Sequence, residues 1–461
     1  MSLAVHSSSN YAVVRKCYRM KVKMRLSRRD NRTDTKPRRA LIEWMVVIIA
    51  FWPFLFNFVN TLPGMLQYLK YMPDAMLAVL VVLSLYGGKI SIQRKLKVPF
   101  VLAILFFFYT LIVYLLQFQT LAYYLWGFRN NFRFIIAFFV FVSVMDDQDA
   151  KNWDLWIERL FWVNLIVSLF QFFVLGLWGD HLGGIFGTEK GVNASSIILI
   201  FMVLSKSLLR TVQGNEKSWL CILKCVSGIF IVAAAELKFM LVVFVVLVLV
   251  SVLWSRISWK KIVIVCIAIV ILQIGIDYAT ELFDYENTLT LQNLWELATK
   301  KNYSSGMDVN RLSAITTLSE RIVKNPIEQI FGLGLGNCDT SSFDACNSTF
   351  FQQYGHLHYT WNMSAMLFLE TGYVGLIIYM LFLVSCGLAA YMQYKRGVGN
   401  TLNNQIAFLM AGLCVALVFY NSSLRTEAAY MIYVVLALPF VDKKKENANA
   451  ENNAIGTSSA T

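Results

Sequence analysis

Long runs of apolar residues, each about 20 residues in length, recur along this chain from Ile42 almost to the C-terminus. A helix of about 20 residues crosses a hydrocarbon core of about 30 Å, so the pattern predicts a polytopic membrane protein of the all-α class. We predict about twelve transmembrane helices, at residues 42–60, 74–87, 98–117, 132–145, 159–177, 192–209, 219–235, 239–254, 261–279, 360–390, 405–421 and 426–441.

One long polar segment interrupts the pattern between the ninth and tenth predicted spans. Long loops commonly carry the residues that meet a substrate. Both ends of the chain are polar, and the N-terminal end lacks the apolar core and cleavage site of a signal peptide. The predicted organisation is a basic tail (1–40), nine spans (41–279), the polar loop (280–359), three spans (360–441) and a second tail (442–461).

Composition supports a membrane protein and changes the meaning of the net charge. Of the 461 residues 57% are hydrophobic and only 15% are charged, whereas globular domains carry roughly 25% charged residues. The net charge of +13 could indicate nucleic-acid binding, but twelve of the 41 Lys and Arg lie between Arg15 and Arg39. A basic leader ahead of the first span is typical of a cytoplasmic anchor. The lipid bilayer is therefore an expected partner and nucleic acid is not.

The charges of the connections predict the orientation. If the N-terminus is cytoplasmic, 29 of the 41 Lys and Arg lie on the cytoplasmic side, as the positive-inside rule requires. A shift of one span would invert the later connections. We therefore predict that both termini are cytoplasmic and that the loop 280–359 faces outward.

A minority of cations remains on the predicted outer side. A cation at membrane depth is costly and usually faces a partner or a polar cavity. The alternative for each is a snorkelling or charge-paired anchor, which for Lys238 would be a local pair with Glu236. These outer cations are Arg129, Arg133, Lys190, Lys238, Arg311, Arg321, Lys324 and Arg425.

Several short motifs follow one another in a characteristic order within this predicted topology. The sharpest lie in and after the polar loop, and two more lie earlier in the chain. They are Asn310-Arg311, Asn325-Pro326, the glycine-rich run 331–337, Glu370-x-Gly372-x-x-Gly375, Trp126-Gly127-Phe128-Arg129 and Glu236-Leu237-Lys238. Because these motifs occur in a matching order along the chain, the chain resembles the O-antigen polymerase and ligase superfamily. The enzymes of this superfamily join lipid-linked glycans outside the bacterial inner membrane.

The resemblance implies a GT-C-like fold and a polymerase of the inner membrane. Its substrates would be undecaprenyl-diphosphate-linked oligosaccharides, joined into O-antigen, capsular or exopolysaccharide without cofactor or metal. A chain-length regulator and a flippase would be its partners. Many relatives have a His-Asn pair where this chain has Trp361-Asn362, with His358 three residues earlier. This departure leans against the first alternative, a ligase that transfers glycan to lipid A core.

A second alternative is a lipid-linked glycan transporter, which twelve spans would also suit. Such carriers commonly contain a two-fold internal repeat. We find none in this sequence, and the long loop has no counterpart in the first half of the chain.

The implied reaction sets two chemical tasks. A sugar hydroxyl attacks the anomeric carbon and expels the lipid diphosphate, whose growing charge an arginine fork can bind in a bidentate manner. A histidine or carboxylate can accept the proton. We assign catalysis to Arg311, Lys238 and His358, and substrate binding to Arg129, Arg133, Arg425, Glu236, His356 and Asn362.

The remaining motifs have plainer interpretations. The glycine-rich run is not followed by Gly-Lys-Ser/Thr, so it is interpreted as a flexible turn rather than a P-loop. Glu370 is expected to be structural, and Gly372 and Gly375 to allow close helix packing. The histidines are too few and too scattered to predict a metal site.

Two cysteines of the long loop, Cys338 and Cys346, lie eight positions apart. We predict a disulfide between them, which an oxidising periplasm would allow and which would stabilise the fold by a few kcal/mol at most. The alternative, in a Gram-positive or reducing setting, is two free thiols.

Overall fold

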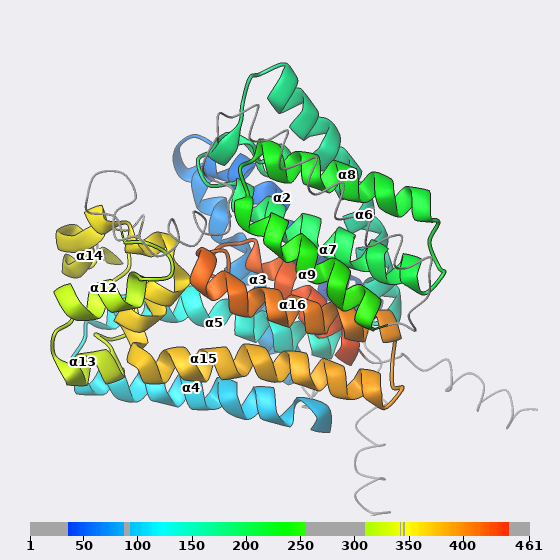
Figure 1. Ribbon diagram of the computed structural model, residues 1–461. Coiled ribbons are helices and arrows are strands. Elements are labelled where there is room, and N and C mark those ends of the chain that lie inside the picture. Colours follow the sequence, from blue (N-terminus) through cyan, green and yellow to red (C-terminus); the bar gives the residue numbers. More distant parts are fainter. Residues whose placement is uncertain (1–35, 87–92, 255–308, 342, 344–345, 442–461) are drawn as a thin grey trace, which may run out of the picture. The chain divides into compact units, whose positions relative to one another are not determined.

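The computed structural model describes residues 36–86, 93–254, 309–341, 343 and 346–441. These residues form α-helices and short 3-10 helices and contain no β-strand, so the predicted all-α class is confirmed for them (Figure 1). Contacts divide the chain into two compact units, Met1–Met45 and Val46–Thr461. Of the first unit only the beginning of one helix is described, and everything below concerns the second.

Eight helices are long and apolar enough to cross a membrane, which supports a multi-pass membrane protein. Each of them overlaps one of the predicted spans. They are α2 (Lys36–Asn60), α3 (Met72–Tyr86) with the 3-10 helix η1 (Gly64–Tyr71) before it, α4 (Lys97–Leu116), α5 (Leu121–Val144), α6 (Asp147–Phe173), α7 (Asn193–Val212), α15 (Met363–Lys395) and α16 (Thr401–Tyr420).

Three shorter apolar helices fall on three further predicted spans. They are α8 (Ser218–Ala234), α9 (Lys238–Leu253) and α17 (Ala429–Ala437), which continues into the 3-10 helix η8 (Leu438–Phe440). The predicted span 261–279, the predicted tail 442–461 and residues 1–35 of the predicted tail 1–40 lie outside the described residues, whereas residues 36–40 belong to α2. The count of twelve spans therefore remains a prediction.

Two helices begin well before their predicted starts. The span predicted at 132–145 belongs to α5, which already begins at Leu121, because its polar first half contacts other protein segments instead of lipid. The span predicted at 159–177 belongs to α6, which begins at Asp147. There Asp146 and Asp149 form a capping box, the arrangement that satisfies the first free backbone N–H groups of a helix.

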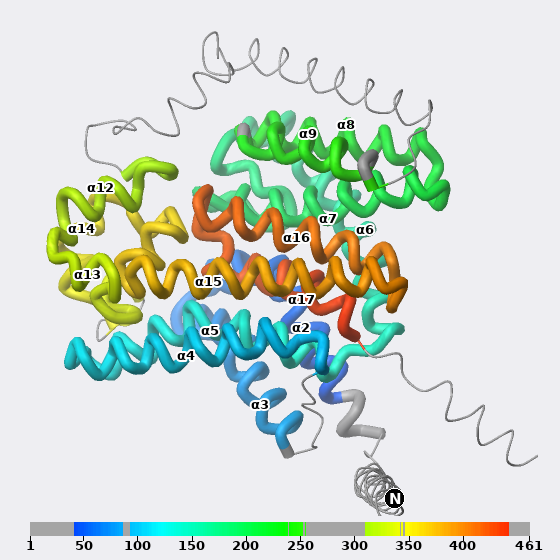
Figure 2. The backbone as a smooth tube through the Cα atoms, turned by 60° about the horizontal axis from the view of Figure 1, so that its bottom comes forward, coloured from blue at the N-terminus to red at the C-terminus, as the bar shows by residue number. Residues whose placement is uncertain are grey.

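The long helices pack side by side, with α15 lying along both α16 and α4 (Figures 1 and 2). Helix α5 packs against α17 and α3, and α7 packs against α8, α9 and α16. The polar loop adds three short helices, α12 (Ala314–Arg321), α13 (Pro326–Phe331) and α14 (Thr349–Tyr354). Both views place these three at one end of the long helices, which we call the loop end.

The connections alternate between the loop end and the opposite end. At the loop end the Met363 backbone N–H donates to the Asn421 carbonyl at 3.1 Å. At the opposite end the Lys95 ammonium donates to the Gln393 side chain at 2.7 Å, and the Gln213 amide donates to the Gln405 side chain at 2.8 Å. These described contacts agree with the predicted order of spans, of which the span 261–279 lies outside the described residues. Which end faces the cytoplasm remains a prediction from the loop charges.

The glycine-rich run docks on a kink in α15. Gly372 has φ 62° and ψ −170° inside this helix, which frees carbonyl groups of the preceding turn. The Leu333 N–H donates to the Leu369 carbonyl at 2.8 Å, and the Gly334 N–H donates to the Glu370 carbonyl at 3.1 Å. The run has the predicted turn conformation, and it is docked on α15, because its N–H groups replace hydrogen bonds that the kink takes from the helix.

Candidate functional site

The polar half of α5 supplies two arginines one helical turn apart, Arg129 and Arg133. Both contact Asp74, at 2.7 Å from Arg129 Nη2 and 3.5 Å from Arg133 Nη1. Arg133 Nη1 also lies 2.9 Å from Glu427 Oε1. The i, i+4 spacing places the two guanidinium groups on the same face of the helix, where they meet acids from α3 and from the segment before α17.

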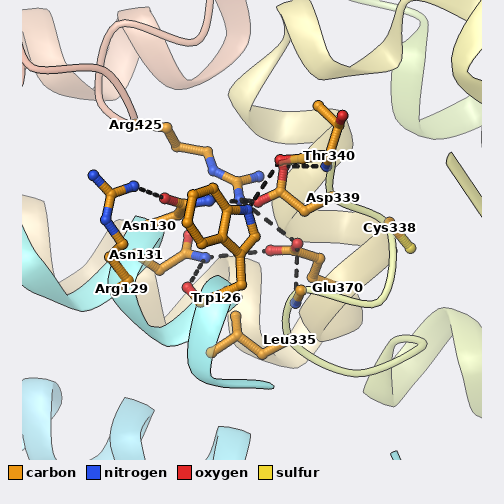
Figure 3. Close-up of polar contacts among 12 residues, drawn as sticks. Trp126, Arg129, Asn130, Asn131, Leu335, Cys338, Asp339, Thr340, Glu370 and Arg425 are labelled. Carbon is orange, nitrogen blue, oxygen red and sulfur yellow. Dashed lines mark hydrogen bonds and ion pairs between the residues drawn. The ribbon is translucent and has the colours of Figure 1, made fainter. Parts of the chain in front are cut away.

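A second group of charges adjoins the first, around Arg425 (Figure 3). Arg425 Nη2 lies 2.5 Å from Asp339 Oδ2 and 3.6 Å from Glu370 Oε1. The Asn130 amide donates to Asp339 Oδ2 at 2.7 Å, and the Asn131 amide donates to Glu370 Oε2 at 3.3 Å. Glu370 is fully buried, so its interactions are with protein groups, and the structural role expected for it agrees with this geometry.

The electrostatics of Arg425 follow from these neighbours. Burial by itself lowers the pKa of Arg425, but the negative charges of Asp339 and Glu370 outweigh burial and raise the pKa above its ordinary value. Arg425 is therefore a permanent cation. Buried charges are stable only when they are paired and hydrogen-bonded, and each carboxylate here has such a partner.

The three arginines at this junction face four carboxylates, so their charge is already compensated. An anionic substrate would have to displace Asp74, Asp339, Glu370 or Glu427. This arrangement favours the charge-paired interpretation of Arg129, Arg133 and Arg425 over the predicted substrate binding. Asp74, Asp339 and Glu427 were not among the functional residues predicted from the sequence. The sequence signal of Asp74 and Glu427 was an acid beside an apolar run, whereas Asp339 stands in the polar loop and had no such signal.

Arg311 lies in a different part of the loop end. Its guanidinium carbon is 4.3 Å from the centre of the Tyr420 ring, and Tyr420 stacks on Phe239 with ring centres 4.3 Å apart. Phe239 follows Lys238, the first residue of α9, whose side chain lies outside the described part of the chain. Arg311 and the start of α9 therefore meet at Tyr420, although they are far apart in the sequence. Arg311 does not sit in the first turn of a helix, because α12 begins three residues later, at Ala314.

His358 adopts a left-handed backbone conformation, with φ 52°, and stacks on Trp361 with ring centres 4.1 Å apart. Residues 359–361 form a 3-10 helix and α15 begins only at Met363, so His358 does not belong to that α-helix. Lys190 Nζ lies 5.9 Å from the centre of the Trp361 ring. A lysine from the α6–α7 connection thus reaches the same place as His358.

Hydrogen bonds connect the Arg311 segment to the His358 segment. The Val309 N–H donates to the Leu357 carbonyl at 3.1 Å, and the buried Asn362 amide donates to the Val309 carbonyl at 3.4 Å. Asn362 is therefore placed by backbone contacts. We call Arg311, Tyr420, Phe239, His358, Trp361 and Lys190 the arginine–histidine site.

Two other predicted substrate-binding residues lie apart from these contacts. His356 is exposed in a 3-10 helix that follows α14. Glu236 has φ 54° in the short break between α8 and α9, and its side chain lies against Gly179. Both are at the loop end, and their predicted role remains untested.

Cys338 and Cys346 are both free thiols, so the structure does not contain the predicted disulfide. Cys338 is buried, and its carbonyl accepts a hydrogen bond from the Tyr359 hydroxyl at 2.7 Å. Cys346 Sγ is instead directed at the Ala122 carbonyl on α5, 3.9 Å away. The two side chains therefore have separate surroundings, and the structure has the free thiols of the alternative.

Among the described residues, no three His, Cys, Asp or Glu side chains are grouped as metal ligands. The arginine–histidine site instead combines cations with aromatic rings and one imidazole. Such a site can bind an anion and accept a proton. No protein-family model matches this chain, and a search of curated proteins finds no match either.

Proposed function

We propose that this protein is a glycosyltransferase that polymerises undecaprenyl-diphosphate-linked oligosaccharide repeat units on the outer face of the bacterial inner membrane. The observation that carries the proposal is Arg311, held over Tyr420 beside the start of α9. The order of the sequence motifs and the multi-pass helical fold support it. A flippase and a chain-length regulator would be its partners.

In the proposed reaction a sugar hydroxyl of one lipid-linked chain attacks the anomeric carbon of another. The bond between that carbon and the diphosphate oxygen breaks, and the lipid diphosphate leaves with the bonding electrons. A guanidinium over an aromatic ring keeps its full charge and its planar fork, which suits phosphate oxygens. Arg311 would bind the diphosphate as its charge grows, and Lys190 would add positive charge nearby.

His358 would accept the proton of the attacking hydroxyl. Its imidazole is held by stacking on Trp361, and its segment is hydrogen-bonded beside Arg311. A general base in this role contributes roughly 10²–10⁴-fold to a rate. A polymerase is favoured over a ligase because Trp361 stands at the position where many relatives have a histidine.

The test compares Arg311→Lys and Arg311→Ala with the matched pair Arg321→Lys and Arg321→Ala. Arg321 is exposed at the end of α12 in the same loop. Arg311→Lys keeps the charge but loses the fork, so both Arg311 variants should lose most polymerisation, while both Arg321 variants keep it. The measurement is glycan length on a gel, with the amount of protein in the membrane as the control.

The same enzyme is then purified and given its lipid-linked repeat unit in detergent. Polymer formed in the absence of any compartment separates a polymerase from a transporter. Wild-type glycan ladders from both Arg311 variants would contradict the role of Arg311, and no polymer from the purified wild type would contradict the proposed function.

A further inference from the structure

Four aromatic side chains gather at the loop end, away from Arg311. Tyr68 and Tyr71 come from η1, Trp126 comes from α5, and Phe343 comes from the connection between α13 and α14. We call these four residues the aromatic platform. The ring centres of Tyr68, Tyr71 and Phe343 are 5.5 to 6.5 Å apart, and the ring planes are within 19° to 29° of parallel. Trp126 packs edge-on against Tyr71 and Phe343, at 6.3 and 6.0 Å.

The platform is accessible from outside the protein. Tyr68 is 45% exposed and Phe343 is 41% exposed, and no residue of η1 is buried. Nearly parallel rings whose centres are this far apart must be offset instead of face to face, so part of each ring face remains uncovered. The three ring centres form a nearly equilateral triangle, so the result is a compact group of partly exposed ring faces.

The platform is also held in a fixed position from behind. The Arg129 guanidinium carbon lies 4.8 Å from the centre of the Tyr71 ring and 4.9 Å from that of Trp126. Asp74 holds Arg129 in turn, through Nε and Nη2, both at 2.7 Å. The Trp126 indole N–H donates to the Thr340 carbonyl at 2.9 Å (Figure 3). A surface that is already ordered loses little conformational freedom on binding.

Polar groups surround the rings. Lys70 Nζ donates to Asn60 Oδ1 at 3.4 Å and lies 5.4 Å from the centre of the Tyr71 ring. On the other side, the Thr340 hydroxyl and the Ser341 N–H both contact Asn347 Oδ1, at 3.2 and 2.7 Å. The rings therefore lie beside ammonium, hydroxyl and amide groups, and this polar edge suits a polar ligand better than lipid chains. A pyranose matches both features, because it has a face of C–H groups and a rim of hydroxyls.

We propose that the aromatic platform binds pyranose residues of the glycan chain, and this proposal rests on the proposed function. Thr340 follows Asp339, and Asp339 pairs with Arg425, which lies five residues after Tyr420. The platform is thereby connected to the ring that holds Arg311. A chain retained on the platform between additions is extended further before release, so the platform sets chain length and not the chemical step.

The test removes single rings in the full-length protein. The variants are Tyr68→Ala and Phe343→Ala, with Tyr68→Phe and Phe343→Tyr as ring-preserving controls. A further control is Phe118→Ala, because Phe118 is 94% exposed at the same end of the protein and lies outside the platform. The measurements are the glycan ladder, the amount of protein in the membrane, and the binding of soluble oligosaccharides. These oligosaccharides are released from the surface polysaccharide of the cells that produce the protein.

We expect the two Ala variants to polymerise but to give shorter chains, and to bind the released oligosaccharides roughly two- to ten-fold more weakly than wild type. The three controls should match wild type. Unchanged chain length and unchanged binding in both Ala variants would contradict the proposal that the platform binds the glycan. So would a loss of protein from the membrane with an unchanged ladder, which would identify the rings as a bilayer anchor.

The binding measurement separates this proposal from the proposed function. If purified wild type forms no polymer but the Ala variants still bind the oligosaccharides more weakly, the glycan site stands and the polymerase does not. If wild type polymerises and ring removal has no effect on length or binding, the polymerase stands and the platform does not.

Discussion

Arg425 donates a hydrogen bond to Asp339 across 2.5 Å, and the two side chains are only 8% and 10% exposed. This pair joins segments that are 86 residues apart in the chain. On the Arg425 side the chain continues from Tyr420, on which Arg311 stacks. On the Asp339 side, the neighbouring Cys338 carbonyl accepts from Tyr359, which adjoins His358. The ion pair thus connects the two halves of the arginine–histidine site.

Removing either partner of this pair should destabilise the protein. Arg425→Ala leaves Asp339 and Glu370 buried without their cation, and breaking a buried pair costs about 3–5 kcal/mol. Thermal unfolding in detergent measures the loss. Arg396→Ala is the matched control, because Arg396 is exposed at the opposite end of the helices. In a cycle of Arg425→Met, Asp339→Leu and the double variant, the loss in the double variant should be smaller than the sum of the two single losses. An additive double variant would show that the pair does not contribute as a unit.

The docked glycine-rich run makes a second prediction, with a closely matched control. Gly336 and Gly214 have the same backbone angle, φ 79°. A Cβ at Gly336 would collide with the Tyr123 carbonyl oxygen of α5, whereas a Cβ at Gly214 would meet nothing within 4 Å. Gly214→Ala should therefore cost only the strain of this conformation, about 1–2 kcal/mol.

Gly336→Ala should cost that strain and about 1–3 kcal/mol more, because the loop must move away from α5. Thermal unfolding of the two variants isolates the collision from the strain. Equal losses would mean that the glycine-rich run is not held tightly against α5.

The buried thiol of Cys338 should make stability depend on pH. Burial raises its pKa well above the ordinary value, and the negative charges of Glu370 and Asp339 raise it further. A thiol in the unfolded chain ionises near pH 8.5, so above that pH the unfolded state gains a favourable ionisation that the folded state lacks. Stability is fully present below about pH 8.5 and falls as pH rises, by about 1.4 kcal/mol for each further pH unit.

Comparison of wild type with Cys338→Ala isolates this group from all others. The difference in unfolding free energy between the two proteins should change in favour of Cys338→Ala between pH 8 and pH 9.5. A constant difference would mean that Cys338 titrates normally. The intact mass of the protein should also be the same with and without reductant. A mass lower by two hydrogens in the absence of reductant would show that the disulfide forms.

The orientation in the membrane can be tested at two exposed positions. Glu189 lies in the α6–α7 connection at the loop end, and Asn215 lies in the α7–α8 connection at the opposite end. In a background without native cysteines, an impermeant maleimide added to intact cells should label Glu189→Cys and leave Asn215→Cys unlabelled. Labelling of Asn215→Cys alone would show that the orientation is the opposite of the predicted one.

The sequence alone was sufficient for those properties that depend on local composition. Crossing a bilayer requires a run of about 20 apolar residues, and such runs are visible without any tertiary contact. The all-α class and the approximate positions of the described apolar helices could therefore be predicted. Helix starts such as Leu121 were misplaced, because polar residues at the start of α5 contact other segments instead of lipid.

The tertiary structure decided which charges are compensated and where the candidate site lies. The pairing of Arg425 with Asp339, and of Arg129 and Arg133 with Asp74, depends on contacts between distant segments that no local pattern encodes. The kink at Gly372 turns the glycine-rich run into a docked segment, since only the folded α15 presents the carbonyls that this run binds. Long-range packing likewise brings Arg311 onto Tyr420 and gathers the aromatic platform from three separate segments.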